Sequence, residues 1–407
     1  MRKLTITASL ALALASTTAI AQNSVQNVKA NTGYVYSEQD FERGVANLPM
    51  NTNAFNSVSY SFAITDPRML DMSQKQSHTQ SREFSMDVTG AQLQKGINLS
   101  TSGKGALVRI SAFDGKSAIE PRSLDIISHK AGKQTTFAKG SGFDTIVDSQ
   151  AMQKTGMGFQ RGTTGFKMAD NLGQGQFTLK AGKDVNANSR YRINVFDKNS
   201  DTELHLTANK NAYLQSDKLH VSAKVFDQGD TQKIRHINGQ IVSPDGSTHN
   251  VIFSKSADGY QVNMPLNMPA SKKPGVLWEL ETEVETMVDG QMVKRNGRVP
   301  FAYTYQTAKF AGSAQLMGAA DNLTAMVPVQ AVSDGRYEVR GVLYATNHKG
   351  QRVPVMVTHS AANLSAGNGA IVMQFDTALL AKSGLKAPFS LDQVQLRDQT
   401  QMAVLAQ

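Results

Sequence analysis

Three oxygen-bearing side chains at alternate positions form the best-defined chemical motif of the sequence. Asp197, Asn199 and Asp201 repeat the D-x-N-x-D start of a calcium loop, in which alternate side-chain oxygens converge on one ion. The glycine and the distal glutamate that complete such a loop are replaced here by Thr202 and Ala208. The incomplete motif makes calcium a candidate cofactor, and the competing interpretation is a turn capped by Asp and Asn.

The sequence contains no other pattern that nominates a reactive group. It has no cysteine, which excludes thiolate catalysis, thiolate zinc sites and iron–sulfur clusters. Neither H-E-x-x-H nor G-x-S-x-G occurs, and Ser383 and Lys386 match S-x-x-K without the accompanying S-D-N or K-T-G motifs. The row of alternate glutamates over 279–285 is expected to face solvent. We therefore assign no catalytic and no cofactor-binding residue.

The first residues have the order of a cleavable secretory signal. The positive charges of Arg2 and Lys3 precede an apolar run over 8–15, and the small residues of 19–21 form an A-x-A cleavage site. The apolar run is too short to span a bilayer, which requires about 18–20 residues. We expect residues 1–21 to be removed and the protein to be exported, to the periplasm or outside the cell.

Beyond a polar lead-in, period-two alternation of apolar and polar residues dominates, as is typical of half-buried antiparallel strands. The stretch from Trp278 to Glu285 is the clearest example, with apolar residues on one face and carboxylates on the other. A short helix is expected between Ser37 and Leu48. The predicted fold class is all-β, with tandem antiparallel β-sandwich (immunoglobulin-like) domains and that short N-terminal helix.

Turn residues between the strands suggest the domain organisation. The predicted ranges are a signal peptide over 1–21, an N-terminal β-rich domain with a lead-in segment over 22–203, an immunoglobulin-like sandwich over 204–306 and a C-terminal sandwich over 307–407. Pro328 and Pro354 lie inside apolar runs and are expected on edge strands or at bulges.

The formal net charge of +9 favours acidic partners such as envelope glycans. Nucleic acid is not expected, because the densest basic cluster, formed by Lys294, Arg295 and Arg298, has no interleaved aromatic residue on which bases could stack. We expect that cluster to be a solvated face. No later segment is long and apolar enough to span a membrane, and the oligomeric state is left open.

Several short motifs resemble a known family. The sequence over 213–303 resembles bacterial immunoglobulin-like and macroglobulin-type sandwich domains. The motifs Gly335-Arg336-Tyr337, Phe375-Asp376 and Ala387-Pro388-Phe389 resemble the C-terminal part of exported bacterial proteins of unknown function. That family has a signal peptide and three β-rich domains. The resemblance implies a secreted or envelope protein of Gram-negative type, and it transfers no catalytic residue.

These observations lead to two functional hypotheses. The first is a non-enzymatic binding or adhesion protein that recognises an envelope or extracellular protein or glycan. The alternative is an enzyme or protease-interacting accessory protein, with a site assembled from residues distant in sequence. A concave pocket that combines an apolar lining with convergent polar groups would favour a ligand site and would show its chemistry.

N-terminal sequencing of the exported protein tests the signal prediction, and we expect the mature chain to begin at Gln22. The variant Ala21→Arg removes a small residue from the cleavage site and should leave the leader attached. Recovery of the full-length chain from the cytosol of wild-type cells would contradict the prediction.

Overall fold

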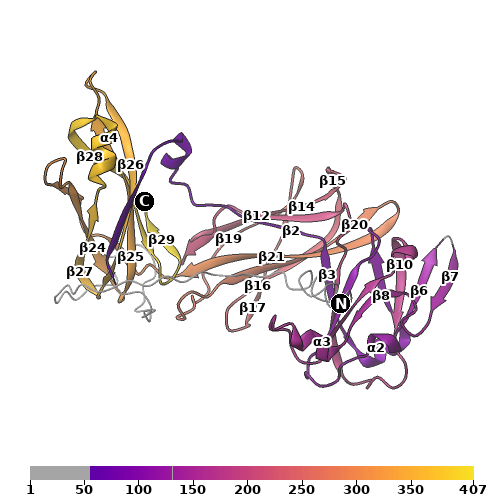
Figure 1. Cartoon of the computed structure of the whole chain (residues 1–407). Coiled ribbons are helices and arrows are strands. Elements are labelled where there is room, and N and C mark those ends of the chain that lie inside the picture. Colours follow the sequence, from indigo (N-terminus) through magenta and orange to yellow (C-terminus); the bar gives the residue numbers. More distant parts are fainter. Residues whose placement is uncertain (1–55, 131) are drawn as a thin grey trace.

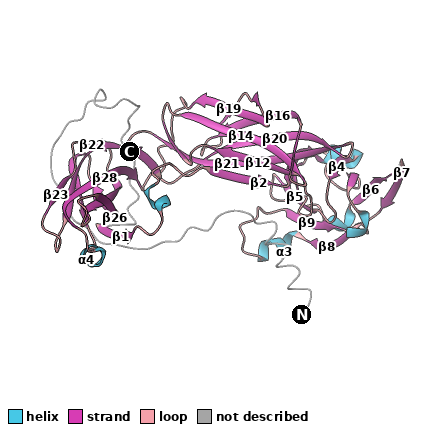
Figure 2. Cartoon of the chain, turned by 90° about the horizontal axis from the view of Figure 1, so that it is seen from above, coloured by secondary structure: helices cyan, strands magenta, loops and turns pink. Residues whose placement is uncertain are grey.

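The computed structural model describes residues 56–130 and 132–407. These residues fold into three β units that follow one another along an elongated, bent molecule, and their strands are antiparallel except for the parallel pair β13 and β21 (Figure 1). Helices are few and short (Figure 2), so the predicted all-β class with tandem sandwiches is confirmed. The predicted signal, lead-in and N-terminal helix lie outside the described residues. Within the described ranges, no helix is long and apolar enough to cross a membrane.

The N-terminal unit is a sandwich whose two sheets bury alternate residues of their strands, among them Leu99, Ile110 and Phe177. One sheet has the order β3 (Glu83–Thr89), β11 (Arg190–Phe196), β5 (Leu107–Ala112), β9 (Thr163–Met168) and β8 (Phe143–Val147). The other has the order β4 (Ile97–Thr101), β10 (Gly175–Lys180), β6 (Asp125–Lys130) and β7 (Lys133–Phe137). Connections include α2 (Gly90–Lys95), η3 (Pro121–Ser123), α3 (Ser149–Lys154) and η4 (Asp170–Leu172). Strands β3 and β4 are therefore both edge strands, one in each sheet.

The central unit packs two further sheets around the only tryptophan, Trp278. The first sheet has the order β18 (Ser254–Ser256), β19 (Gly259–Pro265), β14 (Lys218–Asp227), β12 (Glu203–Ala208) and β2 (Ser77–Ser81), with β15 (Asp230–Gln232) paired to β14. The second has the order β13 (Ala212–Leu214), β21 (Gln291–Thr304), β20 (Trp278–Val288), β16 (Ile234–Val242) and β17 (Thr248–Asn250). The turn between β20 and β21 has positive φ at Asp289 and Gly290, as a tight hairpin requires.

The C-terminal unit is built on two sheets as well. The larger has the order β1 (Val58–Ala63), β26 (Arg352–Leu364), β25 (Gly335–Thr346), β28 (Lys386–Asp398) and β29 (Ala403–Ala406). In the smaller, β24 (Thr324–Ala331) pairs with β22 (Ala308–Phe310), β23 (Gln315–Met317) and β27 (Gly367–Gln374). Helix α4 (Thr377–Ser383) follows β27, and Asp376 caps it. The buried residues of both sheets form one apolar core.

The first described strands run through all three units. Strand β1 pairs with β26 of the C-terminal unit, β2 pairs with β12 of the central unit, and β3 pairs with β11 of the N-terminal unit. A segment that contains η2 (Pro67–Leu70) connects β1 to β2. Strands β1 and β2 come from the range 22–203 but complete sheets of the C-terminal and central units. The chain therefore passes along the whole length of the molecule before it enters the N-terminal sandwich (Figure 1).

A buried tyrosine fixes the start of the C-terminal unit. Tyr337 on β25 is fully buried, and its hydroxyl donates to the carbonyl oxygens of Ser333 and Thr307, at 2.8 and 3.2 Å respectively. Burial raises the pKa of this hydroxyl, so it remains a donor. The bond to Thr307 holds the start of the C-terminal unit, just before β22, against β25 of the larger sheet.

We expect Tyr337→Phe to destabilise the C-terminal unit by about 1–3 kcal/mol, because two buried carbonyls lose a donor. Hydrogen exchange of peptides from β25 and β28 would report the loss within that unit. Tyr344→Phe on the same strand is the matched control, because Tyr344 is partly exposed and loss of its hydroxyl should change stability by less than about 0.5 kcal/mol. Equal loss of protection in both variants would contradict this role for Tyr337.

Candidate functional site

The three predicted calcium ligands have separate surroundings. The carboxylate of Asp197 accepts hydrogen bonds from the backbone amides of Ser102 and Gly103, at 2.8 and 3.1 Å. Asn199 uses its amide nitrogen to donate to a backbone carbonyl, and Asp201 is exposed. Over 56–130 and 132–407, no group of three or more acidic, histidine or cysteine side chains could hold a metal ion. The calcium site stays a prediction.

Asp197 instead forms a buried ion pair with Arg295, a residue of the central unit. The Nη2 atom of Arg295 lies 3.0 Å from a carboxylate oxygen of Asp197, and both side chains are completely buried. The same nitrogen donates to the hydroxyls of Ser102 and Ser200, each at 2.8 Å. Burial raises the pKa of Asp197 and lowers that of Arg295, while the attraction between their charges opposes both shifts.

The other two guanidinium nitrogens of Arg295 also donate hydrogen bonds, so this side chain joins the two units. Its Nε donates to the carbonyl of Thr202 at 3.0 Å, and Nη1 donates to the carbonyl of Lys294 at 2.7 Å. On the same strand, the side-chain oxygen of Asn296 accepts from the backbone amide of Ser85 on β3 at 3.0 Å. The bond between Ser85 and Asn296 holds β21 against the edge strand β3, and the pair of Arg295 with Asp197 ties β21 to the segment that follows β11.

The burial of Arg295 corrects the expectation that the cluster of Lys294, Arg295 and Arg298 is a solvated face. Lys294 and Arg298 remain accessible, whereas Arg295 has an exposed side-chain fraction of 0%. The sequence does indicate this burial, because Arg295 lies an even number of positions from the buried residues Val293 and Val299 and therefore on the same face of β21. A period-two reading of this strand therefore places its side chain inside.

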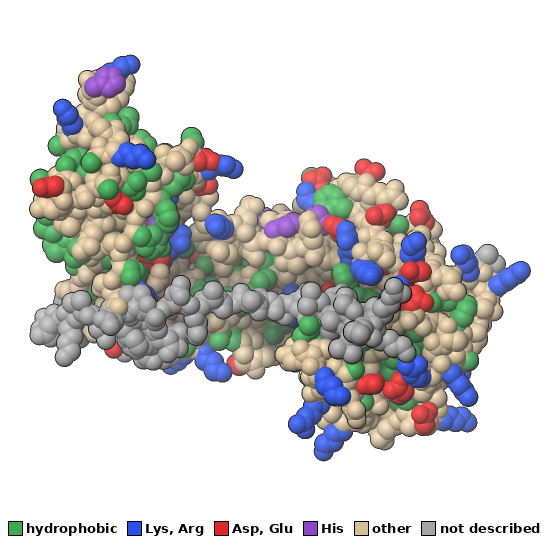
Figure 3. Space-filling view, in the orientation of Figure 1, with side chains coloured by type: hydrophobic (Ala, Val, Ile, Leu, Met, Phe, Trp, Pro, Cys, Tyr) green, Lys and Arg blue, Asp and Glu red, His purple; other side chains and the backbone are tan. Residues whose placement is uncertain are grey.

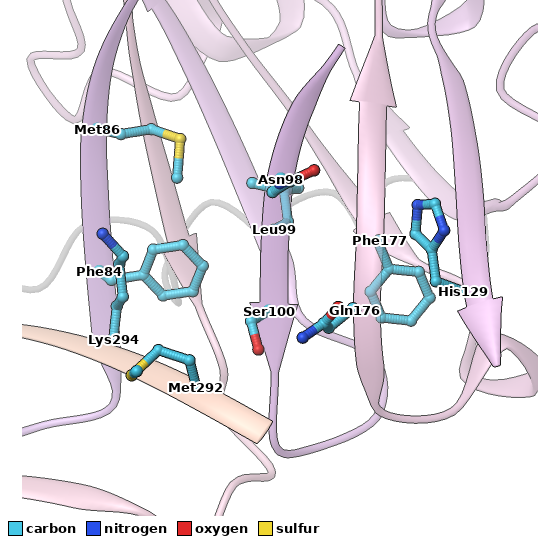
Figure 4. Close-up of a pocket in the computed structure, with 10 residues that line it drawn as sticks. All are labelled: Phe84, Met86, Asn98, Leu99, Ser100, His129, Gln176, Phe177, Met292 and Lys294. Atoms are coloured by element: carbon cyan, nitrogen blue, oxygen red, sulfur yellow. The ribbon is translucent and has the colours of Figure 1, made fainter. Parts of the chain in front are cut away.

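A cleft of about 410 Å³ opens beside this joint, where β3 and β4 face β21. Because β3 and β4 are the edges of two different sheets, the interior of the sandwich is reached between them. Its lining consists of Phe84, Met86, Asn98, Leu99, Ser100, His129, Gln176, Phe177, Met292 and Lys294 (Figure 4). The volume lies within the range of small-molecule sites, which is about 300–1,000 Å³.

The apolar part of the cleft comes from both units. Phe84, Leu99 and Phe177 are buried core residues of the N-terminal sandwich, so they have fixed positions. Met86 on β3 and Met292 on β21 are half-buried. Their flexible thioether side chains can adapt to an apolar group that enters between the strands.

Polar side chains of the sheet that contains β4 line one edge of the cleft. Ser100, Gln176 and His129 occupy neighbouring positions across β4, β10 and β6. The Nε2 atom of His129 lies 2.8 Å from the hydroxyl oxygen of Thr178. Lys294 lies 2.8 Å from a carboxylate oxygen of Glu285, so its charge is balanced by a residue outside the lining. The cleft therefore offers hydroxyl, amide and imidazole groups around an apolar centre.

We expect Arg295→Met to lower the free energy of unfolding by about 3–5 kcal/mol, because it leaves the Asp197 carboxylate buried without its charge partner. Urea denaturation followed by Trp278 fluorescence measures the loss in the central unit. Arg298→Met on the same strand is the control, because its pair with Glu279 is exposed and worth about 0–1 kcal/mol. Similar losses in the two variants would contradict a special role for the buried pair.

Comparisons with known proteins agree with this three-part architecture. Three models of a domain of unknown function, DUF4785, match the chain: the N-terminal domain over 50–197, the central domain over 200–304 and the C-terminal domain over 307–407. A crystal structure of a DUF4785 family protein from Legionella pneumophila aligns with a TM-score of 0.63 at 20% identity, covering 93% of this chain and 96% of that chain.

Two further solved structures align with much lower TM-scores. A marsupial T cell receptor aligns with a TM-score of 0.19 at 9% identity, covering 72% of this chain and 99% of that one. Escherichia coli alpha-2-macroglobulin gives 0.18 at 8% identity, covering 79% and 33%. A search of curated proteins finds no match. The three consecutive domain matches confirm the resemblance noted in the sequence, and the chain belongs to the DUF4785 family, whose function is unknown.

Proposed function

We propose that this chain is an exported, non-enzymatic binding protein that accommodates an amphipathic ligand, or an amphipathic part of a larger partner, in the cleft between β3, β4 and β21. The observation that carries the proposal is the combination of a fixed apolar floor with a row of hydrogen-bonding groups. Ligand sites in proteins commonly have this composition. Burial of one leucine-sized group would contribute about 1.5–3 kcal/mol to affinity.

The chemistry of the lining supports binding over catalysis. His129 and Lys294 are the two titratable groups among the lining residues, and both have polar partners. Nucleophilic or general-base catalysis usually relies on a reactive side chain that a partner such as a carboxylate orients, whereas His129 contacts a threonine hydroxyl and Lys294 is paired with Glu285. The cleft contributes shape and hydrogen bonds, which are the requirements of a binding site. Export is part of the proposal, and its support is the leader pattern of residues 1–21.

Filling the cleft tests the proposal. The amphipathic dye anilinonaphthalene sulfonate should bind the purified mature protein, and its displacement can then be used to find natural ligands in envelope extracts. Met292→Trp places an indole in the cleft, so dye affinity should fall at least about tenfold, corresponding to about 1.4 kcal/mol. Measurement of dye fluorescence against protein concentration gives both affinities.

Met317→Trp is the matched control, because Met317 is an exposed methionine of the C-terminal unit and lies outside the cleft. It should leave dye affinity unchanged. Equal affinity in the Met292→Trp variant would overturn the cleft as the binding site. Turnover of a substrate by the wild-type protein, without retention of any ligand, would overturn the non-enzymatic function.

A further inference from the structure

Two histidines meet on the outer face of the first sheet of the central unit. His78 lies on the edge strand β2 and His205 on its neighbour β12, where His78 is opposite Thr207 and His205 is opposite Gln80. The two histidines are therefore diagonal neighbours, and their ring centroids are 5.4 Å apart with an interplanar angle of 81°. Figure 3 shows histidine side chains at the surface of the central unit. We refer to His78 and His205 as the histidine pair.

Each ring of the pair is held through one of its two nitrogens. Nε2 of His205 lies 2.8 Å from a carboxylate oxygen of Glu203, and Nδ1 of His78 lies 2.9 Å from the hydroxyl oxygen of Thr207. A neutral imidazole that donates its single N–H to such an acceptor keeps a lone pair on the other nitrogen. Histidines that bind metal ions in proteins are commonly oriented in this way, through a hydrogen bond from the nitrogen that does not bind the metal.

The two nitrogens that remain are Nε2 of His78 and Nδ1 of His205. Within residues 56–130 and 132–407, neither of them has a hydrogen-bond partner. His78 is exposed, and the side chain of His205 is 22% exposed. The ring of Phe226 packs beside His205, with centroids 4.6 Å apart, and limits the movement of that ring. The pair therefore has two unused ring nitrogens on an open face of the sheet.

Two cations next to the pair each have a carboxylate partner. Arg82 is paired with Glu203, and Lys224, which lies opposite His205 on β14, is 3.1 Å from a carboxylate oxygen of Asp258. The bond from His205 and the charge of Arg82 hold the pKa of Glu203 below its usual value, although burial acts in the opposite direction. Glu203 is therefore ionised at neutral pH, and its negative charge favours a cation bound to His205.

We infer that the histidine pair binds a divalent transition-metal ion that prefers imidazole nitrogen, Zn²⁺ or Cu²⁺. Two imidazoles on one tetrahedral ion, with metal–nitrogen bonds of about 2.0–2.1 Å, have ring centroids about 5 Å apart. The separation of 5.4 Å is close to that value, so β2 and β12 already hold the rings at the required spacing. Each ring can turn about its own metal–nitrogen bond, so coordination requires no particular interplanar angle.

The pair supplies two ligands, and water or a donor group of another molecule completes the coordination. This agrees with the finding that the described ranges contain no group of three acidic, histidine or cysteine ligands. The ion would join the edge strand β2 to β12. Because only the folded chain brings His78 and His205 together, metal binding stabilises this strand pairing. The site is separate from the cleft, whose lining includes neither histidine.

Titration calorimetry of the mature protein with ZnCl₂ and CuCl₂ tests the site, and MgCl₂ is the control because Mg²⁺ prefers oxygen ligands. We expect one Zn²⁺ to bind per chain and Mg²⁺ to bind far more weakly. His78→Gln and His205→Gln should each lower the affinity for Zn²⁺ at least about tenfold, and Glu203→Gln should lower it about tenfold by releasing the His205 ring. His220→Gln, on β14 of the same sheet face, is the matched control and should leave the affinity unchanged.

Spectroscopy of the unaltered chain adds a test that does not depend on the folding of any variant. Electron paramagnetic resonance of the one-to-one Cu²⁺ complex should show coordination by two imidazole nitrogens, and hydrogen exchange of β2 peptides should slow when Zn²⁺ is added. Absence of binding by both Zn²⁺ and Cu²⁺ would overturn the inference. Unchanged Zn²⁺ affinity after replacement of both histidines would overturn it as well, because the ion would then be held elsewhere on the chain.

Discussion

The buried ion pair between Asp197 and Arg295 is the contact on which the candidate cleft depends. Neither charge could remain inside the protein alone, so each one fixes the position of the other and of the hydroxyls and amides around them. Asp197 follows the last strand of the N-terminal sandwich, and Arg295 lies on β21 of the central one. The pair therefore sets how β21 lies against β3 and β4, and with it the position of Met292 in the cleft.

The N-terminal segment adds a second constraint at the scale of the whole chain. Strands β1 and β2 supply edges to sheets whose other strands come from residues far along the sequence. Arg340 and Gln395 of the C-terminal unit donate to the carbonyls of Met69 and Met72 in the connecting segment. The segment before the N-terminal sandwich therefore contacts both of the units that follow it in the sequence.

The alternation of Trp278 with the glutamates of β20 was sufficient to predict the strand and its buried face, because period two follows from strand geometry. The role of Asp197 could not be predicted in the same way. Its local spacing resembles a calcium loop, while its actual partner lies 98 positions away. The cleft also combines strands that are distant in sequence, and one sequence carries no signal for which sheet edges meet. The phase of Arg295 within β21 was the one readable sign of the joint.

The central claim is that the Asp197–Arg295 pair holds the N-terminal and central units in one arrangement, so that the cleft is preformed. Because the chain has no cysteine, spin labels can be attached specifically at Lys133→Cys on β7 and Lys255→Cys on β18. Double electron–electron resonance between the two labels should give a narrow distance distribution. Adding Arg295→Met should broaden that distribution. A broad distribution in the labelled parent, or an unchanged narrow one with Arg295→Met, would contradict the account.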